Sequence, residues 1–226
     1  METPLQSLTD RYIAAQLAGD RATALQIMLE EGIGRGIPVS ELYLNVIQPA
    51  QHRIGRLWQE NRITVAQEHL ATAISQLVLA HLYPLLPREP ENGLVAVVAC
   101  VPGELHDMGS RVAADFFEMS GYDVRFLGAN VPVESLAAMV AETCADIVVL
   151  SVVMTFNLPG LREAVRAIRS AHGASPRIIV GGPAIESAPG LADELGIDLW
   201  GVSITDALAA ARTLLASQPA DLEAAG

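Results

Sequence analysis

Cysteine is scarce in this sequence, which contains only Cys100 and Cys144 among its 226 residues. Neither cysteine has the spacing of a zinc-binding motif, and both lie inside or beside apolar runs. A small secreted domain stabilised by disulfides would need more of them, so the count predicts a reducing compartment. We therefore expect both thiols to be small, buried and unreactive, and neither to be catalytic.

Basic residues are also few. The sequence has 14 lysines and arginines and 26 aspartates and glutamates, which gives a formal net charge of −12. The basic side chains are arginines scattered along the chain rather than clustered in one segment. Proteins that bind DNA or RNA directly need clustered positive charge to neutralise phosphates. The composition therefore argues against direct nucleic-acid binding.

Long apolar runs are absent, although 51% of the residues are hydrophobic and the mean hydropathy is +0.34. A membrane-spanning helix needs roughly 18 or more consecutive apolar residues, and no window approaches that length. The opening residues, METPLQSLTD, lack the basic and then apolar pattern of a secretory signal. We expect a cytoplasmic protein without membrane association.

The first part of the chain, to about residue 86, has apolar positions at helical spacing and few β-branched runs. This pattern, with short links, predicts an antiparallel four-helix bundle. The third helix should begin with Ser40 as a possible cap and kink at Pro49. The fourth should begin at Thr64, with Gln67 completing a capping box. The expected helices cover about residues 4–17, 20–31, 40–57 and 64–82.

The charged, proline-rich segment PREPENG separates this half from one with a different period. We divide the chain into a helical cap domain at 1–87, a linker at 88–92 and a second domain at 93–226. In the second domain, strand-length apolar runs alternate with helical patterns, which indicates an α/β fold with a doubly wound, five-stranded parallel sheet, Rossmann-like or flavodoxin-like. The expected strands are 94–101, 124–127, 147–153, 178–180 and 199–202, and the expected helices are 110–120, 133–143, 158–172, 186–195 and 204–216.

Unusual residues follow three of these strands, at the edge where such sheets bind ligands. The first loop, PGELHDMG, has a histidine where a nucleotide-binding loop would have glycines. The third and fourth loops contain hydroxyl side chains and a Gly-Gly pair, which permits close approach of a flat or bulky group. A lone histidine is more often an ordinary surface residue, buried hydroxyls often satisfy backbone groups, and Gly-Gly is usually a turn. Together at one edge they favour a binding site.

These three loops resemble the D/E-x-H-x-x-G, S-x-x-x-T and G-G signature of cobalamin-binding domains, over about residues 93–216. The resemblance implies base-off, His-on cobalamin, with His106 as the lower axial ligand of cobalt and Glu104 holding the imidazole. Most corrinoid methyltransferase proteins have aspartate where this chain has Glu104. The implied cofactor-binding residues are Glu104, Leu105, His106, Asp107, Met108, Gly109, Ser151, Val153, Thr155, Gly181 and Gly182.

A second motif lies in the helical half, where Trp58 is followed after nine residues by Glu68 and His69. This spacing resembles the W-x9-E-H motif of cobalamin-dependent photoreceptors of the CarH type. The resemblance implies that Trp58 packs over the adenosyl group of adenosylcobalamin and that Glu68 contacts the adenosine. It further implies that His69 supports Glu68 or approaches cobalt once the adenosyl group is lost. A tryptophan in a helix is otherwise most often a core residue.

The two motifs together predict a light sensor rather than an enzyme. Repressors of this type carry an amino-terminal helix-turn-helix, which is not found in this sequence, so output is expected through self-association or another protein. Some stand-alone photoreceptors of similar architecture also bind a bilin such as biliverdin, which here would be non-covalent. A methyl-carrying corrinoid protein and a cobalamin carrier remain alternatives, although methyl carriers typically continue with Gly-Lys-Asn where this chain reads DMGSRV.

Overall fold

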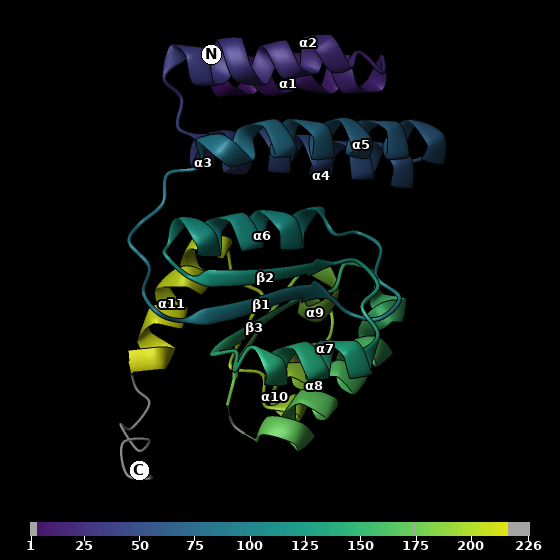
Figure 1. Ribbon diagram of the computed structural model, residues 1–226. Helices are drawn as coiled ribbons and strands as arrows, with labels where there is room; N and C mark the ends of the chain where they lie inside the picture. Colours follow the sequence, from purple (N-terminus) through teal and green to yellow (C-terminus); the bar gives the residue numbers. More distant parts are fainter. Residues whose placement is uncertain (1–3, 174, 217–226) are drawn as a thin grey trace. The chain divides into compact units, whose positions relative to one another are not determined.

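The computed structural model describes residues 4–173 and 175–216 (Figure 1). The chain divides into two compact units, a helical unit at Met1–Pro87 and a sheet unit at Arg88–Gly226. No helix in the described parts of the chain has both the length and the apolar character needed to cross a membrane. The two units are considered separately below.

The helical unit contains the four predicted helices, of which the first and last have the expected form. Helix α1 spans Pro4–Leu17, and α5 spans Val65–Leu82 with Thr64 as its N-cap and the Thr64–Gln67 capping box in place. The second and third are each interrupted by a π-helical turn. Their parts are α2 (Arg21–Gln26), η1 (Ile27–Gly32), η2 (Ile33–Arg35), α3 (Val39–Leu42), η3 (Tyr43–Ile47) and α4 (Gln48–Gln59), and η4 (Tyr83–Leu85) follows α5.

The structure bears on two predictions for the third helix, its N-cap at Ser40 and its kink at Pro49. The prediction of Ser40 as its cap is wrong, because the helix already begins at Val39, with Pro38 in the N-cap position. Near Pro49, where a kink is expected, a π turn ends directly before the helix that contains this proline. Proline has no backbone N–H to donate to the carbonyl of Asn45. The Thr9 hydroxyl of α1 lies 3.2 Å from that oxygen and 2.8 Å from the carbonyl oxygen of Leu5, so its single proton is within reach of an acceptor on each helix.

The sheet unit is a five-stranded parallel sheet with strand order β2-β1-β3-β4-β5. This is the flavodoxin-like order, in which the chain changes direction across the sheet between β1 and β3. The doubly wound fold predicted from the alternating pattern is therefore confirmed. The strands are β1 (Val95–Cys100), β2 (Asp123–Gly128), β3 (Ile147–Ser151), β4 (Arg177–Gly181) and β5 (Leu199–Trp200).

Helices cover both faces of the sheet. Helices α6 (Met108–Met119) and α11 (Ile204–Ala216) lie on one face, and α7 (Val133–Glu142), α8 (Leu158–His172), α9 (Pro183–Glu186) and α10 (Pro189–Leu195) lie on the other (Figure 1). Alternate residues of each strand point to opposite faces. On the second face they form one apolar core with the helices, which includes Val97, Ala99, Val148, Leu150, Leu136, Leu161, Val165, Ile178, Val180 and Ile185.

Two predictions for this unit are wrong. The helix expected at 186–195 is two shorter helices, because the chain leaves the helical conformation at Ala188, and Pro189 begins the second one. Cys144 is exposed, with a positive φ of 48°, since it lies in the turn between α7 and β3 rather than in the strand. Cys100 is buried as expected, and burial raises the pKa of its thiol to about 11. That thiol therefore stays protonated at neutral pH.

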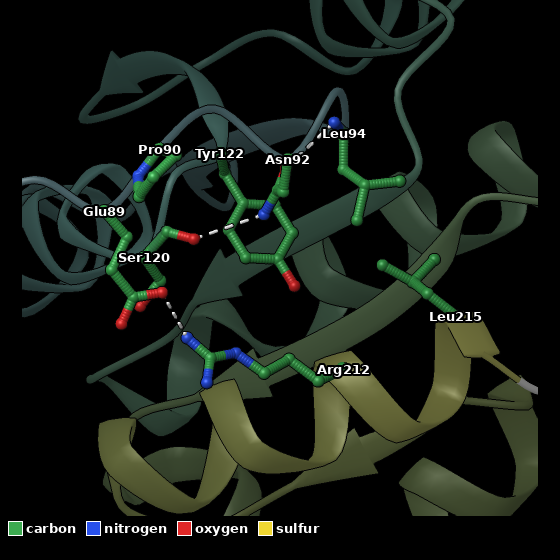
Figure 2. A pocket seen from close by; sticks show the side chains of 8 residues that line it. All are labelled: Glu89, Pro90, Asn92, Leu94, Ser120, Tyr122, Arg212 and Leu215. Carbon is green, nitrogen blue, oxygen red and sulfur yellow. Dashed lines mark hydrogen bonds and ion pairs between the residues drawn. The ribbon is translucent and has the colours of Figure 1, made fainter.

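Residues 88–92, which have the composition of a linker, are hydrogen-bonded to the sheet unit. The N–H groups of Glu89 and Asn92 donate to the carbonyls of Met119 and Gly121, each at 2.9 Å. Arg212 of α11 pairs with Glu89 at 2.9 Å, across an open pocket of about 460 Å³ that Tyr122 also lines (Figure 2). A side chain at residue 121 would place its Cβ 2.2 Å from the Pro90 carbonyl oxygen, so the segment lies against a glycine.

Candidate functional site

The carboxyl ends of three central strands are in register at one edge of the sheet. Cys100 is paired with Ser151, and Ser151 with Gly181, at the ends of β1, β3 and β4. The loop from Val101 to Asp107 follows β1 directly and leads into α6. Because strand order reverses between β1 and β3, this edge is the place where flavodoxin-like sheets bind ligands.

Glu104 is the centre of the hydrogen-bonding at this edge. It is fully buried, and its Oε2 accepts from the backbone N–H groups of Val153 and Met154 and from Nδ2 of Asn157, each at 2.9 Å. Its Oε1 accepts from the backbone N–H of His106 at 3.0 Å and from Nδ1 of the same residue at 2.5 Å. Only an ionised carboxylate accepts at both oxygens in this way. The loop after β1 is thereby tied to the loop after β3.

The balance of burial and hydrogen bonding fixes the charge of Glu104. Burial by itself raises the pKa of a carboxyl group, because it disfavours the charged form. Here the N–H of Met154, the Asn157 amide and both donors of His106 outweigh that effect and lower the pKa of Glu104 to about 2. Glu104 is therefore negatively charged at neutral pH, although no solvent reaches it.

The carboxylate determines which nitrogen of His106 is available. Since charged Glu104 can only accept, Nδ1 of His106 carries a proton and donates it to this bond. In the neutral ring, Nε2 then holds the lone pair, and the hydrogen-bonded carboxylate fixes this tautomer and the orientation of the ring. The His106 side chain is 47% exposed, so this nitrogen is accessible to a ligand. The arrangement is that of a metal-binding imidazole with its supporting acid.

Other residues hold the loop in shape. The backbone N–H of Gly103 donates to Oδ1 of Asn130, and the N–H of Asn130 donates to the carbonyl of Glu104, each at 2.9 Å. Asp107 precedes α6, and its carbonyl accepts from the Ser110 hydroxyl at 2.8 Å. Met108 and Gly109 begin the helix, and a Cβ on Gly109 would have nothing within 4 Å. Gly109 thus leaves space beside the histidine.

The two glycines after β4 have different functions. A Cβ on Gly181 would meet nothing within 4 Å, so this position leaves open space at the strand end. A Cβ on Gly182 would lie 2.2 Å from the carbonyl oxygen of Val152, and its φ of 100° is one that side chains rarely adopt. Gly182 is thus required by the fold itself. Ser151 is buried at the end of β3, and Thr155 is exposed in the following turn.

Sequence reasoning missed two residues of this edge. Asn157 is buried and donates to Glu104, and the only signal for it was a polar residue shortly after the S-x-x-x-T motif. Phe156 is 70% exposed, as is Leu105 in the loop after β1, and Val202 after β5 is 39% exposed. All three residues follow strands of the sheet, at the edge where sheets of this kind bind ligands. Nothing in the sequence distinguished Phe156 from a core residue.

The helical unit holds the second group of predicted residues. Trp58, near the end of α4, lines a hollow of about 310 Å³ at the turn into α5, together with Asn61, Ile63 and Val65. Glu68, in the first turn of α5, accepts from the Thr72 hydroxyl at 2.9 Å, and its Oε2 lies 2.6 Å from Nδ1 of His69. The His69 side chain is 74% exposed and that of Glu68 is 19% exposed. The structure therefore joins Glu68 and His69 directly.

The residues around His106 fit a corrinoid. A cobalt ion in a corrin ring already has its equatorial nitrogen ligands and needs an axial one, for which imidazole is suited. His106 provides such a nitrogen with a fixed tautomer. The exposed side chains of Leu105 and Phe156 and the open space at Gly181 suit a large, flat and partly apolar group. Cobalamin bound here would gain a protein ligand for its cobalt.

Comparisons with known proteins agree with this fit. Residues 94–210 match the family described as "B12 binding domain", and residues 8–83 match a second family with the same description. The chain is 30% identical over 192 residues to the HTH-type transcriptional repressor CarH of Myxococcus xanthus, which covers 84% of this chain and 62% of the repressor. It is 24% identical over 180 residues to dimethylamine corrinoid protein 1 of Methanosarcina acetivorans, covering 78% of this chain and 84% of that protein.

A solved structure shares the fold across both units. The monomethylamine corrinoid protein of Methanosarcina barkeri has a TM-score of 0.80 at 17% identity, covering 92% of this chain and 99% of that one. The named relatives are corrinoid proteins and a transcriptional repressor, in keeping with a cofactor-binding protein rather than an enzyme. The match covers more than half of the chain, and it includes the hydrogen-bonded residues Glu104 and His106. The chain belongs to the B12 binding domain family and is a cobalamin-binding protein.

Proposed function

We propose that this protein is a light sensor that binds adenosylcobalamin base-off and His-on. His106 is the lower axial ligand, and Trp58, Glu68 and His69 recognise the upper, adenosyl ligand. The observation that carries the proposal is the hollow lined by Trp58 at the turn into α5, together with the hydrogen-bonded Glu68–His69 pair in the first turn of that helix, since an indole and a carboxylate suit a nucleoside. A methyl ligand has neither a ring to stack nor hydroxyls to bind.

The lower side of the site needs a ligand that remains in place whatever happens above the cobalt. Glu104 supports this, because five donors from two loops fix its position and its charge. The imidazole of His106 is then held by a carboxylate that cannot turn away. Ser151, Thr155 and Gly181 line the same edge and would contact the nucleotide tail of a base-off corrinoid.

The upper side would be supplied by the helical unit. An indole offers a flat apolar surface for an adenine ring, and a carboxylate accepts hydrogen bonds from ribose hydroxyls. Trp58 lines a hollow, and Glu68 is held by Thr72 with part of its side chain exposed. His69 supports Glu68 through Nδ1, which leaves its other ring nitrogen available.

Adenosylcobalamin, when bound, supplies a cobalt–carbon bond that visible light breaks. Trp58 and Glu68 would then lose the group they recognise, and contacts made in one state alone can shift a conformational equilibrium. We expect the change to be read out through self-association or a downstream protein. A non-covalent bilin such as biliverdin would be a second chromophore of this sensor.

A second function has specific support from the relatives. Several are named dimethylamine corrinoid proteins, and two of them match this chain at 24% identity. A methyl-carrying corrinoid protein would use the same His106 and Glu104 but would have no use for Glu68 beside Trp58. A simple cobalamin carrier would keep the same assembly in light and darkness, and its affinity would not depend on the upper ligand of cobalt. The three functions therefore differ in what green light does to the loaded protein.

Green light is expected to change both the spectrum and the assembly of the loaded protein. The protein is reconstituted with adenosylcobalamin in darkness and measured by absorption spectroscopy and by light scattering after gel filtration, before and after illumination. Protein loaded with methylcobalamin is the control for photolysis without an adenosyl group. An unchanged mass and shape after complete bleaching would contradict a sensor and favour a carrier.

Substitution of Trp58 by alanine is expected to lower the preference for adenosylcobalamin over methylcobalamin. Loss of a stacked aromatic contact is worth about 1–2 kcal/mol, which corresponds to about a five- to thirtyfold change in the ratio of dissociation constants. Titrations of both cobalamins in darkness give this ratio. Trp200 of β5 is in the sheet unit, and Trp200→Phe serves as the matched control. An equal ratio in Trp58→Ala and wild type would remove Trp58 from the site.

A further inference from the structure

A continuous series of side-chain hydrogen bonds runs from Glu68 into the interior of the helical unit. The Thr72 hydroxyl lies 2.9 Å from Oε1 of Glu68 and 3.2 Å from Oε1 of Gln51 on α4. Nε2 of Gln51 donates to the hydroxyl of Ser75 at 2.6 Å. Ser75 is fully buried, whereas Glu68 is partly exposed. The series therefore links the surface of α5 with the core.

The buried end of this series reaches a third helix. Ser75 lies 2.9 Å from the phenol oxygen of Tyr12 and accepts from Nε2 of Gln16 at 2.6 Å, and both of these residues belong to α1. Tyr12 and Gln16 are fully buried. Nε2 of Gln16 also donates to the carbonyl of Ala71, while its Oε1 has no partner among the described residues. Polar groups buried this deeply in an apolar core are costly unless their arrangement is maintained.

The Thr72 hydroxyl connects Glu68 with the Gln51 amide. Thr72 has a single hydroxyl proton but two acceptors within hydrogen-bond distance. It can therefore donate a well-formed hydrogen bond to Glu68 or to Gln51, but not to both. If the Gln51 amide turns over, its NH2 donates to Thr72, and its oxygen accepts from the Ser75 hydroxyl. Thr72 is then free to donate to Glu68 alone. The orientation of a core amide is thus linked to what Glu68 binds.

We propose that Thr72 and Gln51 are positioning residues for Glu68, and that they transmit the occupancy of Glu68 to the core through Ser75. The inference rests on the proposed function, in which Glu68 contacts the adenosyl group. A carboxylate on a helix surface would otherwise sample several rotamers, and fixing it beforehand lowers the entropic cost of ligand binding. The Thr72 hydroxyl thus contributes to specificity without touching the ligand.

The first measurement compares Thr72→Val, which removes only the hydroxyl at nearly constant volume, with Thr72→Ser, which restores it. Thr72→Val is expected to lower the preference for adenosyl- over methylcobalamin in darkness about five- to tenfold, and Thr72→Ser to retain it. Thr213→Val is the matched control, since the Thr213 hydroxyl also bonds to a residue four positions earlier, but on α11. An unchanged preference in Thr72→Val would overturn the positioning role.

The second measurement needs no cofactor. Denaturant unfolding of the full cofactor-free chain is measured for Thr72→Val, Glu68→Ala and the double variant. Their effects on the folding equilibrium constant are expected to differ from additivity by about two- to fivefold, whereas Thr213→Val and Glu68→Ala should be additive. Additive effects of Thr72→Val and Glu68→Ala would overturn the coupling. If wild type itself shows no adenosyl preference, the proposed function fails, and this cycle alone decides whether Thr72 holds Glu68.

Discussion

Replacing His106 with alanine is expected to change the absorption spectrum of bound cobalamin and to weaken its binding by about 100-fold or more. Loss of a residue that merely supports a metal ligand usually costs about 10- to 100-fold in affinity, so loss of the ligand should cost at least as much. Nε2 of His106 is the nitrogen that Glu104 leaves available, and no other imidazole lies in the loops after the strands. Water or no ligand would then occupy the lower position.

The fold should survive this substitution, because Glu104 keeps its donors from Val153, Met154 and Asn157. The measurement is a spectrophotometric titration in darkness, followed by addition of imidazole, which should restore part of the wild-type spectrum by entering the vacated space. His81→Ala is the matched control, since the His81 ring bonds to the Leu77 carbonyl on its own helix. A spectrum of His106→Ala identical to that of wild type would exclude His106 as the axial ligand.

Glu104→Gln is expected to destabilise the sheet unit by about 2–4 kcal/mol in the absence of any cofactor, because a buried hydrogen-bonded charge is replaced by a group with the wrong pattern of donors. The glutamine NH2 would face the N–H groups of Val153 and Met154 or both donors of His106, whichever way the amide turned. Either the backbone N–H groups of Val153 and Met154 or that of His106 would then remain unsatisfied in the interior.

Urea unfolding followed by circular dichroism gives the free energy of unfolding for wild type and Glu104→Gln. Glu194→Gln provides a matched control, because Glu194 lies on α10 with its side chain 46% exposed and pairs only with surface arginines. Exposed ion pairs contribute about 0–1 kcal/mol. If Glu104→Gln were as stable as Glu194→Gln, the five donors around Glu104 would not be holding the two loops together.

The two substitutions separate cofactor ligation from folding. His106→Ala removes the nitrogen but leaves the carboxylate with three donors, whereas Glu104→Gln disturbs both the loop after β1 and the loop after β3. A spectral change without loss of stability is expected for the first, and both effects for the second. This difference follows from the burial of Glu104 and the partial exposure of His106.

The regular parts of the fold could be predicted because local signals and tertiary packing agree there. The apolar runs that became β1 and β3 are buried except at Val95, which is half-buried, and the Thr64–Gln67 capping box marks the start of α5 from the sequence alone. The same holds for the contact between Glu104 and His106, whose spacing places both in one loop. In these places, interactions between residues close together in the sequence were sufficient to predict the structure.

The rest depends on contacts between distant segments. The π turns before Ile33 and Gln48 have no local sequence signal, and the second lies against α1, where the Thr9 hydroxyl is 3.2 Å from the Asn45 carbonyl oxygen. The part played by Asn157 depends on its reaching Glu104 across two loops, and no local pattern reveals it. The exposed position of Cys144 results from a turn whose geometry the apolar run beside it concealed.

The attachment of residues 88–92 has a practical consequence for dissecting the protein. A fragment that began at residue 93 would lack Glu89, the partner of Arg212, and would leave the Met119 and Gly121 carbonyls without their donors. It would also uncover Gly121, against which Pro90 lies, and the neighbouring Tyr122 ring, which is now 4% exposed. A domain boundary chosen from amino-acid composition alone would therefore remove residues that belong to the folded sheet unit. An autonomous sheet unit should be expressed from Arg88 onward.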